Sequence, residues 1–146
     1  MKPLAGGAID DAKLAIKYIL SKDYIDVVIP GMESIEQVRE NVSVIQDTNI
    51  TKDDELKIQE IRNIMGKRFC RRCEYCLPCP LKINIPQNFL LEGYYARYNL
   101  KDWAKERYKY LEVKASACVE CGLCETKCPY ELPIREMLKE VSSKLD

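Results

Sequence analysis

The stretch CRRCEYCLPCP, residues 70–80, places four cysteines within ten positions and ends in proline. A second stretch, CVECGLCETKCP, residues 118–129, repeats the arrangement with three cysteines at three-residue intervals and a fourth followed by proline. All eight cysteines of the chain lie in these two stretches, and the chain contains no histidine. The fold of the second half therefore depends on what two groups of four thiols bind.

Length, charge and hydropathy limit the other possibilities. The chain has 146 residues, 47% hydrophobic and 32% charged, which is typical of a soluble globular protein. Basic and acidic residues balance, so the composition gives no sign of a nucleic-acid-binding surface. The sequence shows neither a secretory signal nor an apolar run long enough to span a membrane. We therefore predict a cytoplasmic protein, in which thiols stay reduced and bind metal more readily than they form disulfides.

The spacing within each group indicates iron-sulfur ligands. Three cysteines at C-x2-C-x2-C spacing wrap a compact cluster, and a fourth followed by proline completes the bacterial two-cluster pattern C-x2-C-x2-C-x3-C-P. The second group matches this pattern fully, and the first matches it with one residue fewer in the last gap. The predicted metal ligands are Cys70, Cys73, Cys76, Cys79, Cys118, Cys121, Cys124 and Cys128.

The same pattern predicts how the ligands divide between two 4Fe-4S clusters. In two-cluster ferredoxins the fourth cysteine of each run binds the cluster of the other run. The first-group site is therefore predicted to consist of Cys70, Cys73, Cys76 and Cys128. The second-group site is predicted to consist of Cys118, Cys121, Cys124 and Cys79. The shorter gap before Cys79 leaves the exchange of the two fourth ligands open.

A zinc-binding module is the alternative interpretation. Structural zinc also takes four cysteines, usually as two C-x2-C pairs on facing loops, whereas each group here has three cysteines in series and a trailing proline. In that alternative the cysteines hold together a zinc- or cluster-stapled docking module without a redox role. The color of the purified protein distinguishes the iron-sulfur from the zinc interpretation, because a protein that contains 4Fe-4S clusters is brown and bleaches on reduction.

Charged residues differ between the two groups. Lys67, Arg68, Arg71 and Arg72 surround the first group, whereas Glu120 and Glu125 lie in the second. Nearby positive charge favors the reduced, more negative state of a cluster, so we predict the higher reduction potential for the first-group site. The alternative is that this basic run is a solvated surface or a docking patch.

Residues 1–69 are predicted to alternate strands and helices. The run at 1–6 and the apolar run IDVVIPG at 25–31 are typical of buried parallel strands. Helices are expected after Asp10, after Ser34 with Gln37 as a capping box, and from Thr51 to about Met65. Two strands do not complete a parallel sheet, so residues 1–69 are predicted to be an α/β fragment with an open edge.

Residues 70–146 are predicted to be mostly helical. Helices are expected from Pro86 to about Tyr98, after Asn99, and from Pro133 onward. The two cysteine groups are each followed by an apolar pair and a proline-led helix, which indicates two half-domains related by a pseudo-twofold axis.

Taken together, MKPLAGG, VVIPGMESIEQVREN and the two cysteine groups with CLPCPLKINIP resemble the C-terminal part of aldo/keto reductase-like oxidoreductases that carry a ferredoxin-type extension. The resemblance implies that residues 1–46 are the last two β/α units of a TIM-type barrel, and that residues 70–146 are a helical ferredoxin-type domain with two 4Fe-4S clusters. It further implies that the reductase's catalytic residues lie upstream of Met1, so this chain contains no catalytic residue. The expected role is electron transfer.

The resemblance also concerns a nicotinamide cofactor. Members of that family contact NAD(P) through the segment after the last strand, where Ser34, Glu40 and Asn41 would stand on the adenosine side. Gly31 and Gln37 occupy the positions of the basic residues that bind the extra phosphate of NADP, so an NADP preference is not expected. The alternative is that Ser34 only caps its helix. NAD(P) binding is expected only in a complete barrel.

Partners follow from these expectations. The clusters imply a redox partner protein or an upstream barrel segment, and neither nucleic acid nor a membrane is expected. An uncovered strand at the open sheet edge favors self-association.

Overall fold

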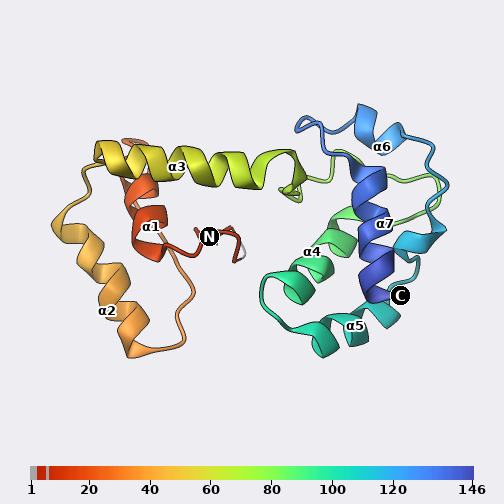
Figure 1. Ribbon diagram of the computed structural model, residues 1–146, viewed down its shortest axis with the longest axis horizontal. Coiled ribbons are helices and arrows are strands. Elements are labelled where there is room, and N and C mark those ends of the chain that lie inside the picture. Colours follow the sequence, from red (N-terminus) through yellow and green to blue (C-terminus); the bar gives the residue numbers. More distant parts are fainter. Residues whose placement is uncertain (1–2, 6) are drawn as a thin grey trace. The chain divides into compact units, whose positions relative to one another are not determined.

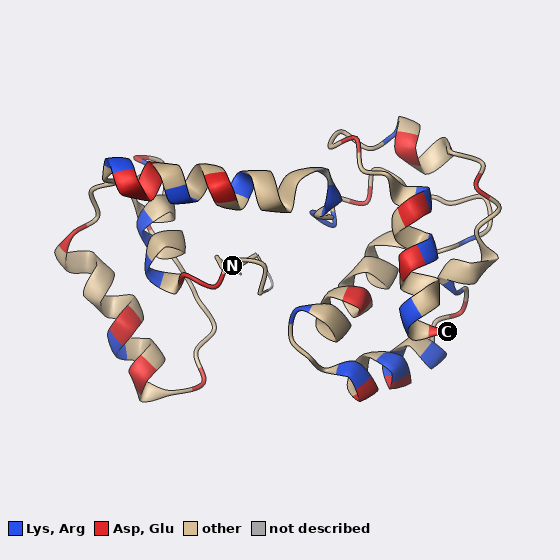
Figure 2. Cartoon of the chain, in the orientation of Figure 1, with Lys and Arg blue, Asp and Glu red and all other residues tan. Residues whose placement is uncertain are grey.

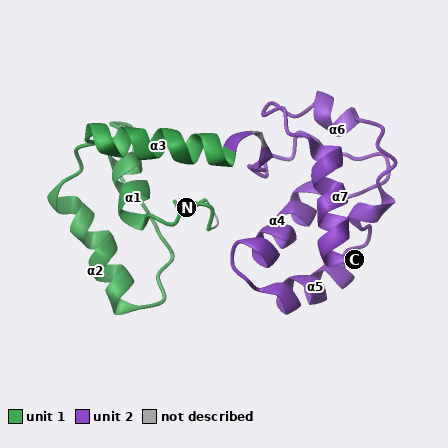
Figure 3. Ribbon diagram, in the orientation of Figure 1, with its two compact units in different colours: residues 1–65 green, residues 66–146 purple. Residues whose placement is uncertain are grey.

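The computed structural model describes residues 3–5 and 7–146, without the side chain of Lys67. The chain divides into two compact units, residues 1–65 and 66–146 (Figure 3). Each unit is described by itself. No helix within residues 3–5 and 7–146 combines the length and the apolar character needed to cross a membrane.

The predicted α/β fold is wrong. Residues 3–5 and 7–146 contain helices, turns and extended segments but no β-strand, so the barrel fragment predicted for residues 1–69 is not present (Figure 1). The run at 25–30 has no regular secondary structure, and Val27 is 71% exposed and Ile29 60% exposed. Of the other predicted strand, residues 3–5 form a turn, and residues 1, 2 and 6 lie outside the described part. An apolar run becomes a strand only when a neighboring strand forms backbone hydrogen bonds with it. The predicted self-association depended on an open sheet edge, and the described residues form no sheet.

The first unit consists of α1 (Ala12–Leu20), α2 (Ile35–Ser43), a short 3-10 helix (Val44–Gln46) and α3 (Lys52–Met65). Side chains cap all three longer helices, because the first backbone N–H groups of a helix have no partner within it. Asp11, and not the predicted Asp10, accepts from the N–H of Leu14 at 2.9 Å. Ser34 accepts from the N–H of Gln37 at 3.3 Å, which confirms that it is a helix cap.

The apolar stripe of α2 is largely exposed. Ile35, Val38 and Val42 of α2 and Ile45 of the following 3-10 helix recur at helical spacing, yet their exposed fractions range from 41% to 71%. The buried apolar side chains of this unit are Leu14, Ala15, Ile16 and Val44. α2 contacts α1 but has no sheet to cover its stripe, so the core of the described part of this unit stays small.

The N-terminus of α3 is fixed by a capping box and an ion pair. Thr51 and Asp54 exchange hydrogen bonds, with Thr51 N–H to Asp54 Oδ2 at 2.9 Å and Asp54 N–H to Thr51 Oγ1 at 3.1 Å. Lys17 of α1 donates to the same carboxylate at 2.9 Å. The first turn of α3 is acidic, which suits the positive end of its dipole (Figure 2).

Stability of the first unit is expected to fall in acid through Asp54. The hydrogen bond from the Thr51 N–H, followed by the contact with Lys17, lowers the pKa of Asp54 from 3.8 to about 2. A carboxyl whose pKa is lowered on folding stabilizes the fold above its unfolded pKa, and that contribution disappears as the pH falls from 3.8 to about 2.

We expect the Asp54→Asn variant to have a lower free energy of unfolding than the parent at pH 6 and to converge with it near pH 2. Denaturant unfolding at several pH values measures this difference. Asp53→Asn removes one exposed carboxylate from the same turn and is the control. Identical pH profiles for the two variants would contradict the assignment.

The second unit is built from four helices around two cysteine-rich loops. They are α4 (Ile85–Ala96), α5 (Lys101–Lys109), the short α6 (Leu123–Thr126) and α7 (Ile134–Leu145), with 3-10 turns at Gly66–Arg68 and Ala115–Ala117. Asn84 caps α4 by accepting from the N–H of Gln87 at 3.1 Å. The predicted cap Asn99 lies before the observed N-cap Leu100 and has a φ of 54°.

A buried core fixes these helices. α4 packs against α5 and α7, and α7 also contacts α6 and the 3-10 turn at Ala115–Ala117. Tyr108 is fully buried, and its hydroxyl accepts from the N–H of Ala115 at 3.0 Å. The side chains exposed by 2% or less in this core are Ile83, Ile85, Leu91, Ala104, Tyr108, Ala115, Ile134, Leu138 and Val141. The same core carries the cysteine loops, because Cys76 belongs to it and Cys70, Cys79, Cys118, Cys124 and Cys128 pack against it.

Candidate metal centers

The sequence repeat is also a backbone repeat. α4 and α7 are both twelve residues long, and each begins at the sixth residue after the fourth cysteine of its group. Residues with positive φ recur at matching places: Arg72 at 55° and Glu120 at 56°, then Glu74 at 67° and Gly122 at 79°. The first turns of the two loops thus share positive-φ positions, and the predicted relation between the half-domains stays a prediction.

Backbone N–H groups point at sulfur in both loops. The N–H of Arg72 donates to Cys70 Sγ at 3.4 Å, and the N–H of Glu120 donates to Cys118 Sγ at 3.4 Å. Such donors stabilize negative charge on a metal-bound thiolate. The sequence analysis missed these donors because they are backbone N–H groups. The signal that could have found them is their common position, two residues after the first cysteine of each group.

One cavity collects the thiols of the first-group site. It is lined by Cys70, Cys73 and Cys76 of the first loop and by Cys128 of the second. Apolar and aromatic side chains form much of the remaining wall, including Phe89, Tyr130 and Leu132. The loop that follows α6 therefore brings the fourth cysteine of the second group to the first.

A second cavity collects the thiols of the second-group site. It is lined by Cys118, Cys121 and Cys124 of the second loop and by Cys79 of the first. Its wall also includes Cys76, together with apolar residues such as Ile83 and Leu138. Four thiols with largely apolar surroundings are the donor set that a 4Fe-4S cluster requires, so the residues around both cavities fit such a cluster.

Cys76 and Ile85 lie on the wall shared by the two cavities. Cys76 is 9% exposed, and Ile85 is 1% exposed. The spacing of the cysteines does not distinguish Cys76 from its counterpart Cys124, so this position between the two sites was not predictable from the sequence.

The thiols differ in acidity and exposure. Burial, followed by negative charge on Cys70 and Cys124, raises the pKa of the Cys76 thiol to about 11. Burial also raises the pKa of Cys70 and of Cys124. These thiols are therefore protonated at neutral pH in the metal-free chain, and metal binding must displace their protons.

All eight cysteines are free thiols. Cys73 and Cys121, the second cysteines of the two groups, are exposed, whereas the other six are buried or partly buried. No three thiols or carboxylates in the described part of the chain converge tightly enough to hold a single metal ion.

The charged residues near the two sites are mostly paired. Arg68 pairs with Glu136 at 2.9 Å and with Glu140. Lys139 Nζ lies 2.8 Å from Glu120, and Arg135 Nη2 lies 2.7 Å from Glu125. These pairs reduce the charge difference on which the predicted order of reduction potentials depends, and that order stays a prediction.

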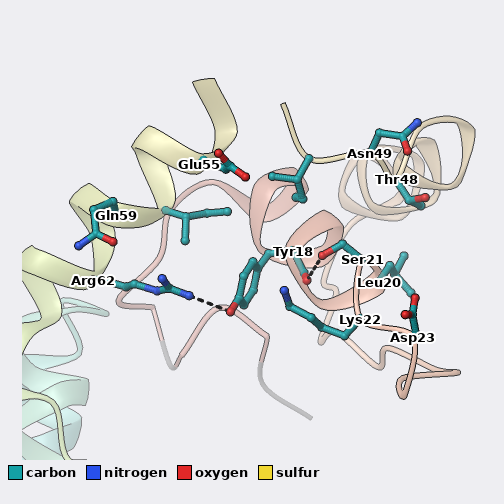
Figure 4. A pocket seen from close by; sticks show the side chains of 12 residues that line it. Tyr18, Leu20, Ser21, Lys22, Asp23, Thr48, Asn49, Glu55, Gln59 and Arg62 are labelled. Carbon is teal, nitrogen blue, oxygen red and sulfur yellow. Dashed lines mark hydrogen bonds between the residues drawn. The ribbon is translucent and has the colours of Figure 1, made fainter. Parts of the chain in front are cut away.

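The first unit has a polar pocket of its own (Figure 4). Arg62 of α3 donates to the hydroxyl of Tyr18 at 2.9 Å, and Lys22 Nζ lies 4.4 Å from the centroid of the same ring. Asp23 and Glu55 are among the other lining residues. Arg62 joins α1 to α3 through this hydrogen bond and through its position 5.7 Å from the Tyr18 ring, whereas Lys22 and Ser21 contact Tyr18 from the end of α1 itself.

Comparison with known families identifies the cysteine-rich half. Residues 69–133 match the family described as a 4Fe-4S dicluster domain. The matched residues lie within the second unit. The match spans both cysteine groups and confirms the predicted cofactor, two 4Fe-4S clusters.

A short portion of a much larger curated protein is also similar to this chain. The acetyl-CoA decarbonylase/synthase complex subunit alpha 1 of Methanosarcina mazei is 30% identical over 79 residues. The alignment covers 52% of this chain and only 8% of that subunit. No solved structure matches the chain. The dicluster family and the decarbonylase subunit give no support for the aldo/keto reductase part of the predicted resemblance.

Proposed function

We propose that the chain transfers single electrons through two 4Fe-4S clusters whose ligand sets are exchanged between the repeats. The observation that carries this proposal is the lining of the two cavities, each of which combines three cysteines of one loop with the fourth cysteine of the other. The ligands of one cluster would be Cys70, Cys73, Cys76 and Cys128, and those of the other Cys118, Cys121, Cys124 and Cys79.

The chain's own residues would hold the two clusters, tune their reduction potentials and shield them from water. The eight thiolates bind iron, and the N–H groups of Arg72 and Glu120 stabilize negative charge on two of the sulfurs. Phe89, Ile83 and Leu138 reduce the access of water to the sites. A bound 4Fe-4S cluster supplies a one-electron change at a potential set by its charge, hydrogen bonds and exposure. Cys76 lies on the wall common to both cavities, between the two sites.

The setting of this function is also a proposal. Eight unpaired thiols suit a reducing compartment, which supports the cytoplasm as the location. The partner would be another redox protein or a catalytic part of a larger enzyme. The match to a short portion of a decarbonylase/synthase subunit supports a place for such a domain within a larger enzyme.

The test is the metal content of protein purified without air. We expect a brown protein with about eight irons and about eight acid-labile sulfides per chain, whose absorbance bleaches on reduction. The zinc alternative predicts a colorless protein that contains zinc. Iron and sulfide that remain negligible after reconstitution would overturn the proposal.

A further inference from the structure

The first-group site has an arginine pair at its edge. Arg71 and Arg72 lie between Cys70 and Cys73, and both are exposed. Arg71 lines the first cavity, where its guanidinium carbon lies 4.2 Å from the centroid of the Tyr130 ring. Cys73 is the exposed thiol of this group. Two cations therefore flank the ligand through which this site is most accessible.

These two arginines differ from three other basic residues near the sites. Arg68, Arg135 and Lys139 each pair with a carboxylate. Within the described part of the chain, neither Arg71 nor Arg72 forms an ion pair. Glu74 also lines the cavity, so the edge carries two positive charges and one negative charge. The charge of the arginine pair is thus available to a partner.

The backbone repeat shows that the loop does not require arginine. Counted from the first cysteine of each group, Arg71 corresponds to Val119 and Arg72 to Glu120. Arg72 and Glu120 have nearly the same positive φ, 55° and 56°, and donate the same N–H to sulfur. Because valine and glutamate serve the same loop, the fold gives no reason for two adjacent arginines.

We propose that Arg71 and Arg72 form a docking surface for an acidic electron-transfer protein at the first-group site. This inference rests on the proposed electron-transfer function and adds the point of contact. Unpaired cations beside an exposed redox site attract an acidic partner over a Debye length, and such attraction raises association rates more than affinity. The second-group site carries no such pair, so the two sites offer chemically different surfaces.

The test uses small redox reagents of opposite charge as probes. Dithionite-reduced protein is mixed in a stopped-flow instrument with the anionic cobalt(III)–EDTA complex or with the cationic hexaamminecobalt(III) complex. One electron leaves a reduced cluster and reduces one cobalt(III) to cobalt(II). In Arg71→Gln/Arg72→Gln, we expect oxidation by the anionic complex to slow by roughly three- to tenfold at low salt. Oxidation by the cationic complex should become faster.

The opposite changes expected in the two oxidation rates distinguish docking from an altered reduction potential. If the arginines acted only by raising the reduction potential of the cluster, their loss would speed oxidation by both reagents. High salt should bring the rates of the variant and the parent together. Lys101→Gln/Lys105→Gln removes the same charge from exposed positions on α5 and should change neither rate appreciably.

A second variant guards against a folding defect. Arg71→Val/Arg72→Glu copies the residues that the second loop uses at the same positions, so the loop is expected to form. It should slow the anionic reagent more than the glutamine variant does, because it also adds a negative charge. Rates that match the lysine control in both arginine variants would overturn the docking proposal. Parent protein without reducible clusters would instead overturn the electron-transfer function itself.

Discussion

Cys128→Ala is expected to abolish the first-group cluster and to leave the second-group cluster in place. Cys128 belongs to the second loop by sequence, but it lines the cavity of Cys70, Cys73 and Cys76. A 4Fe-4S cluster that loses one of four thiolates is lost or degraded. Iron per chain should therefore fall by about half, and one of two reduced-state EPR signals should disappear.

Two reference variants show which cluster remains. Cys73→Ala removes a ligand of the first-group site and Cys121→Ala removes a ligand of the second-group site under either division of the fourth cysteines. The EPR spectrum of Cys128→Ala should match that of Cys73→Ala. Cys79→Ala should match Cys121→Ala. The reverse matches would mean that each loop binds its own cluster with all four cysteines, and the exchange of ligands would be wrong.

The cysteine-rich half was largely predictable because its information is local. Thiol spacing, trailing prolines and the repeated pattern specify short loops followed by helices, and α4 and α7 begin close to the predicted prolines. Each cavity contains the four cysteines that the two-cluster pattern assigns to it, although Cys76 lines both cavities, and the ligand sets stay a prediction. Cysteine spacing could not predict contacts between distant parts of the chain. Two examples are the position of Cys76 between the cavities and the ion pairs of Glu120 and Glu125 with basic residues of α7.

The first half was misread because strand formation is not local. Val27 and Ile29 have the β-branched, apolar character of a buried strand, and yet both are exposed. A run of that composition needs hydrogen-bonded neighbors and covering layers, and the sequence of the run does not say whether they exist. The helices of the same unit were predicted well, because caps such as Ser34 and Thr51 act within one turn.

Leu91→Ala is expected to cause a large loss of stability without touching the cluster sites. Leu91 lies on α4, is 2% exposed and belongs to the core between α4, α5 and α7. Removing a buried leucine side chain leaves a cavity and costs about 2–5 kcal/mol. Because small domains are stable by only about 5–15 kcal/mol, this is a large share of the total.

The measurement compares thermal unfolding of the cluster-loaded variants, followed by helical circular dichroism without air. A loss of that size in a unit of this length lowers the midpoint by roughly 10 °C or more. Leu100→Ala removes the same atoms from a side chain that is 45% exposed and should shift the midpoint by only a few degrees. Iron per chain should stay at the parental value in both variants, since neither leucine lines a cluster cavity. Equal shifts in the two variants would show that α4 does not bury Leu91 as described.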